Sequence, residues 1–539
     1  MPNKFENIIR PYIEQGAAVG TAVAIIQNGQ LTYAGGFGTT TVEESGIQIT
    51  PDTLFAYGSI SKTFCAILVM RLVEAGLLDL NTSISNYLPD LAFSNAGYGR
   101  AITLQNILSH TTGLPMAGKY WGPRYPESLG ESIYEQVSRY QFLSAPGDLY
   151  LYANTVYCTA GHIAEAVTGK FYDELVQEYI FDPLKMGKVT FDPAVVMTYP
   201  LAQAHLENED GSLVEHQMPY NVSGNPSSFA YGSVMDLVNF AQMILAQGAF
   251  EGQQFLLPES IQATQQALGI SFIDGAAHPF SQMNRAYGLG FQVGHYKGHP
   301  SVRHGGMNLS NNCFFDLFPE QKTAVIALTN YCNDPVLMEM ICALYDEVLG
   351  IDEKGIIYQP KPERVPMPSI ALGACCGTFL CVEMGQLLEL SVRNGELVAE
   401  TNGNEYPLVP IGNGRFYIEI TKTYRQMIKF EFKSADDLDY AMIGGMPFHP
   451  WEIETDIDVS GWSAWAGVYQ DPTNKNPNEM MVVTIENGEF AISEDGECSI
   501  GQAISSRAFL THVGLVEANK TQEGQAFLTI GKATRYFKK

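Results

Sequence analysis

YGSISKTFCAILVMRLVEAGLLDL spans Tyr57 to Leu80 and joins a polar start to a long apolar run. The apolar run predicts a buried helix that begins at Ser59 and ends near Ala75. Ser59 and Lys62 are three residues apart, so a helix places them on one face. At the first turn, the Ser59 hydroxyl lies beside unpaired backbone N–H groups and the positive end of the helix dipole. A partly desolvated lysine there can lose its proton and act as a base, so the pair predicts an activated serine nucleophile.

A helix N-cap serine followed by a surface lysine is the simpler explanation of S-x-x-K, because the motif is short. Two downstream fragments favour the catalytic interpretation. The first is Tyr152-Ala153-Asn154, which lies directly before a predicted helix. Tyr152 can hold a proton and pass it to a leaving group, and Asn154 can bind a substrate carbonyl and orient Lys62. The alternative is a core tyrosine followed by an N-cap asparagine.

The second fragment is VRHGGMNLSNN, which contains His304-Gly305-Gly306 after a strand-like run. Two glycines let a backbone pass close to a ligand. The N–H groups of Met307 and Ser59 can then form an oxyanion hole, and His304 can hydrogen-bond the substrate or the Tyr–Lys pair. The alternative is a glycine turn beside an unrelated histidine.

The residues around these motifs predict a first domain with strands at both of its ends. Gly20 to Thr40 alternates around Asn28-Gly29, which is a strong hairpin signal. Strand patterns return at residues 288–293 and 302–330, and helical patterns occupy 156–167, 236–247 and 335–349. We therefore expect one sheet assembled from both ends of residues 1–352, with helices covering its faces.

Beyond residue 352 the helical periodicity is lost. Residues 353–367 are rich in proline and charge and are predicted to be a linker. Two similar alternating stretches follow, beginning at Gly377 and Gly467 and turning at Asn394-Gly395 and Asn487-Gly488. They predict two small antiparallel β-barrels, at residues 368–458 and 459–539.

Composition excludes several classes of protein. The chain of 539 residues carries a formal charge of −27, which disfavours nucleic acid as a partner and argues against anionic membrane surfaces. The N-terminus has no apolar signal-peptide core, and no run of about 18 apolar residues occurs, so we expect a cytoplasmic protein. Nine scattered cysteines without C-x-x-C and ten dispersed histidines lead us to expect neither a metal nor a cofactor.

The three motifs, in this order, resemble the signature of the serine β-lactamase and penicillin-binding protein family, in its D-aminopeptidase and esterase branch. The resemblance covers about residues 5–350 and includes ITLQNILSHTTGLP and YGLGFQV. It implies an α/β (α+β) domain in which an antiparallel sheet has helices on both faces and a helical lobe lies beside it. The catalytic cleft of the family lies between the sheet and the lobe.

The resemblance also assigns roles to individual residues. It implies that Ser59 is acylated, that Lys62 and Tyr152 share the proton transfers, and that Asn154 positions the substrate. Ser59 and Met307 would supply the two oxyanion N–H groups. Which of Lys62 and Tyr152 is the resting base stays open.

One position departs from the family pattern. Members that recognise penicillin carry a lysine where this chain has His304, and Arg303 is a poor substitute because strand neighbours point to opposite faces. A neutral histidine suits amides, short peptides with a free amine, and esters. The two β-barrels resemble those that restrict access to the cleft in D-aminopeptidase-like members.

We therefore expect a peptidase or amidase that acts on small peptides or amino-acid amides, with D-configured substrates as one option. A carboxylesterase, an acyltransferase and a non-catalytic binding protein of the same family are the alternatives. The expected partner is a small-molecule or short-peptide substrate, and a homo-oligomer remains open.

Overall fold

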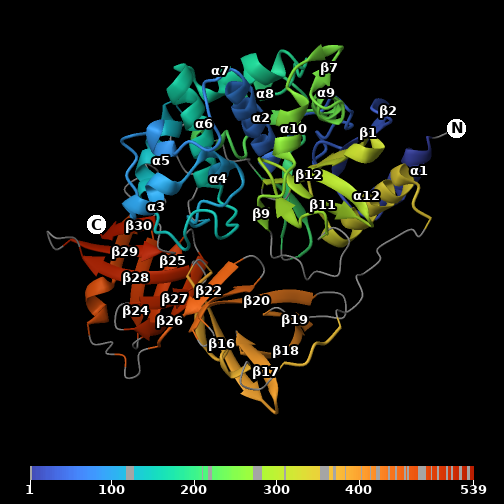
Figure 1. Cartoon of the computed structure of the whole chain (residues 1–539). Coiled ribbons are helices and arrows are strands. Elements are labelled where there is room, and N and C mark those ends of the chain that lie inside the picture. The colour runs from blue at the N-terminus through green and yellow to red at the C-terminus, as the bar shows by residue number, and fades with distance from the viewer. Residues whose placement is uncertain are drawn as a thin grey trace.

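A computed structural model of the chain contains a helix-and-sheet domain and two β-barrels (Figure 1). It describes residues 3–116, 125, 127–208, 210–216, 221–270, 282–308, 311–352, 363–367, 372–382, 384–401, 403–412, 414–419, 425–434, 437–443, 446–453, 457, 461–470, 481–486, 489–494, 497–505, 508–511, 514–520, 525–530 and 534–538.

The first domain is built on an eight-stranded antiparallel sheet with the order β2-β1-β14-β13-β12-β11-β10-β9. Strand β1 pairs with β14, with Thr21 opposite Thr329, so both ends of the domain contribute to one sheet as predicted. The predicted hairpin turn is present, with positive φ at Asn28 and Gly29. The strands are β1 (Gly20–Gln27), β2 (Gln30–Gly38), β9 (Gly269–Ile270), β10 (Ala286–Tyr287), β11 (Gln292–Tyr296), β12 (His299–Asn308), β13 (Asn311–Phe318) and β14 (Thr323–Thr329).

Helices cover both faces of this sheet, because the residues of β1 alternate between two cores. Ala22 and Ala24 belong to the core that contains α2 and α9, whereas Val23 and Ile25 belong to the core that contains α1 and α12. The described α-helices are α1 (Lys4–Glu14), α2 (Ser61–Glu74), α3 (Ala96–Ala101), α4 (Leu104–Leu108), α5 (Ser128–Gln136), α6 (Asn154–Thr168), α7 (Tyr172–Val176), α8 (Pro193–Val196), α9 (Val234–Leu245), α10 (Pro258–Thr264) and α12 (Asp334–Leu349).

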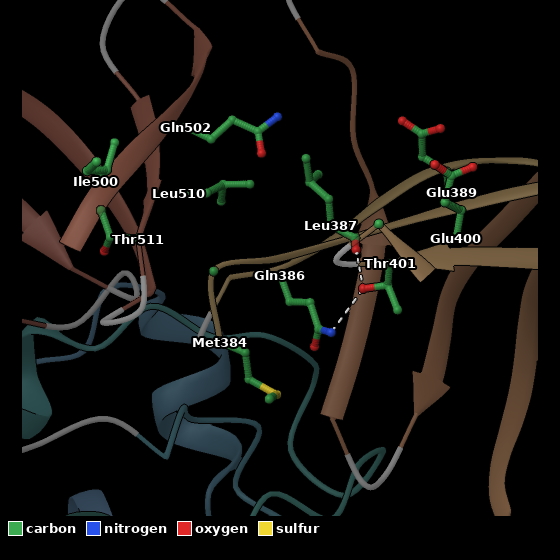
Figure 2. Close-up of a pocket in the computed structure, with 12 residues that line it drawn as sticks. Met384, Gln386, Leu387, Glu389, Glu400, Thr401, Ile500, Gln502, Leu510 and Thr511 are labelled. Carbon is green, nitrogen blue, oxygen red and sulfur yellow. Dashed lines mark hydrogen bonds between the residues drawn. The ribbon is translucent and has the colours of Figure 1, made fainter. Parts of the chain in front are cut away.

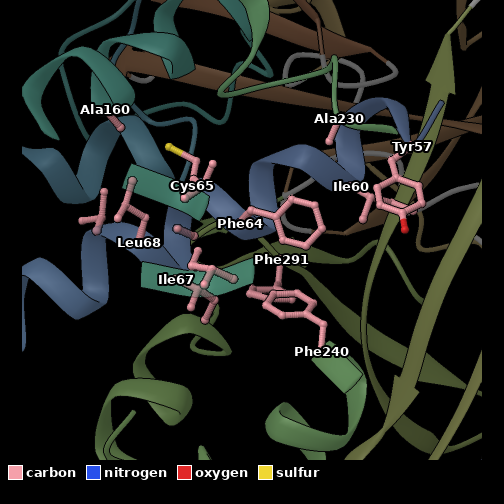
Figure 3. Close-up of a cluster of buried hydrophobic side chains, with 14 of the residues drawn as sticks. Tyr57, Ile60, Phe64, Cys65, Ile67, Leu68, Ala160, Ala230, Phe240 and Phe291 are labelled. Atoms are coloured by element: carbon pink, nitrogen blue, oxygen red, sulfur yellow. The ribbon is translucent and has the colours of Figure 1, made fainter. Parts of the chain in front are cut away.

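Helix α2 lies in the larger core and is buried on almost every side, as its apolar sequence predicts. Its Phe64 ring meets Phe240 of α9 edge-on, with centroids 5.0 Å apart (Figure 3). Each fully buried side chain of this size contributes about 1.5–3 kcal/mol to folding. The helix begins two residues later than predicted, because Gly58–Ile60 form a separate 3₁₀ turn, η1, that carries Ser59.

The C-terminal region forms two closed antiparallel barrels of eight strands each. They begin at Gly377 and Gly467, the two predicted repeat starts, and the predicted turn at Asn394-Gly395 is present. The strands are β15 (Gly377–Cys381), β16 (Gln386–Arg393), β17 (Glu396–Thr401), β18 (Asn404–Gly412), β19 (Arg415–Glu419), β20 (Arg425–Ser434), β21 (Asp437–Ile443), β22 (Met446–Pro450), β23 (Gly467–Gln470), β24 (Met481–Glu486), β25 (Glu489–Glu494), β26 (Glu497–Ser505), β27 (Ala508–Thr511), β28 (Gly514–Lys520), β29 (Ala526–Ile530) and β30 (Thr534–Lys538).

The predicted domain boundaries stay predictions. Most of the linker at 353–367, the turn at Asn487-Gly488 and the boundary at 458/459 lie outside the described residues. The first barrel contacts the helix-and-sheet domain through Met442, which is fully buried against Leu149 and Leu151. Within the described part of the chain, no helix is long and apolar enough to cross a membrane.

Candidate active site

Lys62 is fully buried on α2, and its amine meets three oxygen atoms. Nζ lies 3.1 Å from Ser59 Oγ, 2.6 Å from Asn154 Oδ1 and 2.9 Å from the carbonyl oxygen of Ser227. A neutral amine has two N–H donors and one lone pair. The two carbonyl-type oxygens can accept only, so they take the N–H groups and leave the lone pair for the Ser59 proton.

Ser59 is presented by the η1 turn, and the backbone around it is tightly fixed. Gly58 adopts φ +57°, a left-handed conformation that favours glycine. Ser61 Oγ donates to the Gly58 carbonyl at 2.8 Å and accepts from the Ala230 N–H at 3.1 Å. Ser59 itself is half-buried, so its hydroxyl is held beside Lys62 and is still within reach of solvent.

Burial shifts the pKa values of the two candidate bases, Lys62 and Tyr152, in opposite directions. Desolvation lowers the pKa of the Lys62 amine from 10.5 to about 7. Desolvation raises the pKa of the Tyr152 phenol above its usual 10.0, and a hydrogen bond with Ser59 only partly opposes this rise. Near neutral pH the lysine can therefore accept a proton, while the phenol keeps its own.

Tyr152 is held by His110, a residue that the sequence analysis did not select. The Leu151 N–H donates to the His110 carbonyl at 2.8 Å, and the Ala153 N–H donates to His110 Nδ1 at 3.1 Å. Both neighbours of Tyr152 are thus bonded to one residue, whose ring lies 4.3 Å from the Tyr152 ring between centroids. Because Nδ1 accepts, the proton of this histidine is on Nε2, and burial lowers its pKa so that it stays neutral.

Asn154 is the first residue of α6, and its side chain is turned to Lys62. The N-cap position belongs to Ala153, which has no side-chain cap. The amide oxygen therefore binds the lysine and does not cap the helix. Lys62 Nζ also lies 4.7 Å from the centre of the Tyr152 ring. Ser59, Tyr152 and Asn154 therefore all surround this one amine.

Strand β12 brings the third motif against η1. The pairing of β12 with β11 ends at Arg303. Beyond that residue, Gly306 and Met307 of β12 lie against Gly58 instead. A Cβ atom on Gly306 would lie 1.8 Å from the Tyr57 carbonyl oxygen, and one on Gly58 would lie 2.6 Å from the Met307 nitrogen. The two glycines therefore let the Met307 N–H approach the turn that carries Ser59. The Met307 side chain points outward and is 66% exposed.

His304 lies at the edge of the cluster and uses both ring nitrogens inside the protein. Nδ1 donates to the Gly305 carbonyl at 2.6 Å, so Nε2 accepts from the Tyr287 hydroxyl at 2.8 Å. Burial lowers its pKa to about 3, which keeps the ring neutral. Its ring centre is 6.4 Å from that of Tyr152, and its two ring nitrogens are bonded to Gly305 and Tyr287. This arrangement suits a positioning role better than proton transfer.

Arg303 is paired away from the site, as expected from strand alternation. Its side chain is 4% exposed and forms an ion pair with the fully buried Asp316. It also donates to Asn284 Oδ1 at 2.7 Å. Its charge is thus committed to the far face of the sheet. Among the described residues, no group of three or more His, Cys, Asp or Glu side chains is arranged to hold a metal ion.

Replacing Gly306 with alanine tests whether close approach of β12 builds the oxyanion hole. The added methyl cannot coexist with the Tyr57 carbonyl oxygen, so β12 must move away from η1 and take the Met307 N–H with it. We expect kcat to fall by about 10²–10³-fold, the cost of losing one oxyanion donor. Steady-state kinetics on any hydrolysed ester or amide measures it.

Gly305→Ala is the matched control for this substitution. A Cβ atom there meets nothing closer than Arg303 Nη2 at 3.6 Å, which is ordinary contact. We expect nearly unchanged kcat and thermal stability. Equal losses in both variants would show that the strand, and not the approach at Gly306, matters.

Comparison with known proteins gives one family match and distant relatives. Residues 5–338 match the protein family described as Beta-lactamase. The chain is 28% identical over 343 residues to penicillin-binding protein 4 of Amycolatopsis lactamdurans, covering 62% of this chain and 86% of that protein. It is 24% identical over 488 residues to the unguisins hydrolase ungD' of Aspergillus campestris, covering 82% and 88%.

Two solved structures have the same fold at low sequence identity. SurE aligns with a TM-score of 0.66 and 20% identity, covering 83% of this chain and 98% of its own. D-amino acid amidase from Ochrobactrum anthropi aligns with a TM-score of 0.52 and 21% identity, covering 64% and 96%. The likeness to SurE extends over more of the chain than the family match does.

Proposed function

The chain belongs to the β-lactamase family and is a serine hydrolase, and from this premise we propose that it is an amidase or peptidase with Ser59 as its nucleophile. The proposed substrates are small peptides or amino-acid amides, D-configured ones among them. The observation that carries the proposal is the placement of the buried Lys62 amine, 3.1 Å from Ser59 Oγ with its two N–H groups engaged elsewhere.

The proposed reaction has two halves. Neutral Lys62 takes the Ser59 proton while Oγ attacks the carbonyl carbon, and the oxyanion that forms accepts from the backbone N–H groups of Ser59 and Met307. Tyr152 then donates its proton to the leaving amine and regains one from Lys62. Water repeats the sequence on the acyl-enzyme, which frees the acid and restores the Ser59 hydroxyl.

Three features support an amide substrate without an acidic group. The Tyr152 phenol stays protonated beside Ser59, and an amine leaving group must take up a proton whereas an aryl-oxide need not. The third motif supplies neutral His304, and Arg303 is bound to Asp316, so neither of these positions offers a cation to a substrate carboxylate. The overall charge of −27 favours an amine-bearing substrate over an anionic one.

A carboxylesterase is the second candidate, because the half-buried Ser59 with neutral Lys62 would also attack esters. We would compare matched D- and L-aminoacyl amides, read by ammonia release, with the corresponding methyl esters. The proposal requires that amides be turned over within about 10²-fold of their esters. Ester turnover without measurable amide turnover would replace it with an esterase.

A binding protein that does not turn over substrate is the third candidate. Labelling the intact protein with a fluorophosphonate, read by mass spectrometry, separates it from a hydrolase with an activated serine. One adduct on the wild type and none on Ser59→Ala supports the proposal. An unlabelled wild type favours the binding protein.

The lowered pKa of Lys62 predicts a definite pH dependence. The amine must be neutral to accept a proton, so kcat/KM should fall below about pH 7 and level off above it. The substrate in this experiment must carry no α-amine, because an α-amine has a pKa of about 7.7–8.0 and its titration would mask that of Lys62. An N-acetylated amide or a simple ester meets this need. A flat profile between about pH 5.5 and 9 would contradict a lysine base.

A further inference from the structure

The segment that carries Tyr152 is joined to a neighbouring loop by backbone hydrogen bonds. The Gly147 N–H donates to the Thr111 carbonyl at 2.7 Å. The Leu151 N–H donates to the His110 carbonyl at 2.8 Å. These bonds fix the segment along one edge, so the positions of its side chains also depend on what packs against its faces.

Side chains alternate along this segment between two surroundings. Tyr150 and Tyr152 face the His110 ring, with centroids 6.0 and 4.3 Å away. Leu149 and Leu151 are almost fully buried and belong to a separate apolar cluster. Successive side chains of an extended backbone point to opposite faces. A group that packs on the two leucines therefore supports Tyr152 from behind.

The first barrel supplies that group. Met442 of β21 is fully buried and forms the apolar cluster together with Leu149 and Leu151, with Tyr440 packed at its margin. The neighbour of Met442, Ala441, belongs to the core of the barrel. Alternation along β21 therefore turns Met442 outward, toward the segment that carries the phenol.

The first barrel is held on another side by the second barrel. Leu387 of β16 and Leu510 of β27 line a cavity of about 580 Å³ between the barrels (Figure 2), and both pack in the apolar cluster there. The Leu515 N–H donates to the Val382 carbonyl at 3.1 Å. The described residues that line the cavity all belong to the barrels. This interface can therefore be altered without touching the contacts of Met442.

We propose that the first barrel positions the Tyr152 phenol, with Met442 as the positioning residue. The inference rests on the proposed function, in which Tyr152 protonates the leaving amine. Met442 packs behind Leu149 and Leu151 and so holds the phenol beside Ser59 and Lys62. A displacement of about 1 Å can cost about 10²-fold in rate, so a remote methionine can affect the chemical step.

Met442→Ala tests this with two substrates. One is an amide, and the other is a p-nitrophenyl ester whose leaving group needs no proton. We expect kcat on the amide to fall by about tenfold and the pre-steady-state release of p-nitrophenolate to fall by less than about twofold. Met442→Leu keeps an apolar side chain of similar volume and should restore amide turnover to within about twofold of the wild type. Equal losses on both substrates would overturn the proposal.

Leu510→Ala is the matched control, because it truncates a buried apolar side chain at the interface between the barrels. It should lower thermal stability and leave the amide and ester rates in their wild-type ratio. An amide-selective loss as large as that of Met442→Ala would mean that any loosening of the barrels has this effect, and Met442 would lose its assigned role.

Leu149→Ala tests the route from Met442 to the phenol. We expect an amide-selective loss similar to that of Met442→Ala. The double variant should lose little more than either single one, because contacting residues on one route are not additive. Losses that multiply in the double variant would contradict this route. Leu149→Ala also serves as the test if thermal unfolding shows that Met442→Ala is not folded.

A spectroscopic measurement separates this inference from the proposed function. 3-Fluorotyrosine introduced in place of Tyr152 by amber suppression reports the surroundings of that ring through its ¹⁹F resonance. We expect Met442→Ala to shift or broaden the resonance and Leu510→Ala to leave it unchanged. If Tyr152→Phe shows no amide-selective loss, the proton-donor role fails, and the ¹⁹F resonance still shows whether the barrel positions the ring. An unchanged resonance in folded Met442→Ala would overturn the positioning role.

Discussion

Ser59→Ala should lower kcat/KM by about 10⁴-fold or more, whichever substrate class the enzyme prefers. The substitution removes the oxygen that forms the acyl bond in the proposed reaction and leaves the Met307 N–H and the Lys62 amine in place. Residual turnover would come from binding and the oxyanion donors alone. Initial rates on the best amide, together with the missing fluorophosphonate adduct, measure the effect.

Ser61→Ala is an informative comparison because Ser61 lies two residues away and contacts no reacting group. Its hydroxyl bonds the Gly58 carbonyl and the Ala230 N–H, so its loss should lower thermal stability and reduce activity far less than Ser59→Ala does. Full activity in Ser59→Ala would remove Ser59 from the mechanism entirely.

Tyr152→Phe should lower kcat on amides by about 10²–10⁴-fold, the usual worth of one general acid–base group. The reason is that the raised pKa of the phenol makes it a proton donor to the departing amine. A p-nitrophenyl ester releases an anion that needs no proton during acylation, so its acylation rate, read as the pre-steady-state release of p-nitrophenolate, should fall far less, by about tenfold. The ratio of the two losses is therefore the measurement.

Tyr157→Phe is the matched control. The Tyr157 hydroxyl donates to the Lys62 backbone carbonyl at 2.9 Å, and the Tyr157 ring lies 5.7 Å from Lys62 Nζ. The substitution therefore removes a phenol hydroxyl close to Lys62 that has no part in the proposed proton transfers. We expect a small loss that is equal for amide and ester. Equal losses on both substrates in Tyr152→Phe would instead assign Tyr152 to the first proton transfer.

The residues that the sequence predicts best are those whose side chains perform the proposed chemistry. Ser59 and Lys62 are three apart in one segment, so helical geometry alone brings them together. Tyr152 and Asn154 share a short fragment, and the structure places both at the Lys62 amine. About 90 residues separate Lys62 from Asn154. No periodicity predicts which distant segments meet, so this contact was predicted from the family resemblance alone.

Other parts of the site were beyond sequence reasoning for physical reasons. The Ser227 oxygen that binds Lys62 belongs to the backbone, and residue type does not encode a backbone acceptor. His110 acts through bonds to the two neighbours of Tyr152, and a single histidine after an apolar segment is not distinctive. Strands β9 and β10 have two residues each, too few for an alternating pattern.

The pairing of β1 with β14, in which Thr21 lies opposite Thr329, has a consequence for folding during synthesis on the ribosome. At about 5–20 residues per second, strand β14 emerges roughly 15–60 s after β1. Until then β1 has only its hairpin partner, and its second edge and apolar faces stay open to other nascent chains. Chaperone capture of the early chain, and poor solubility of fragments that stop before residue 323, follow from this late closure.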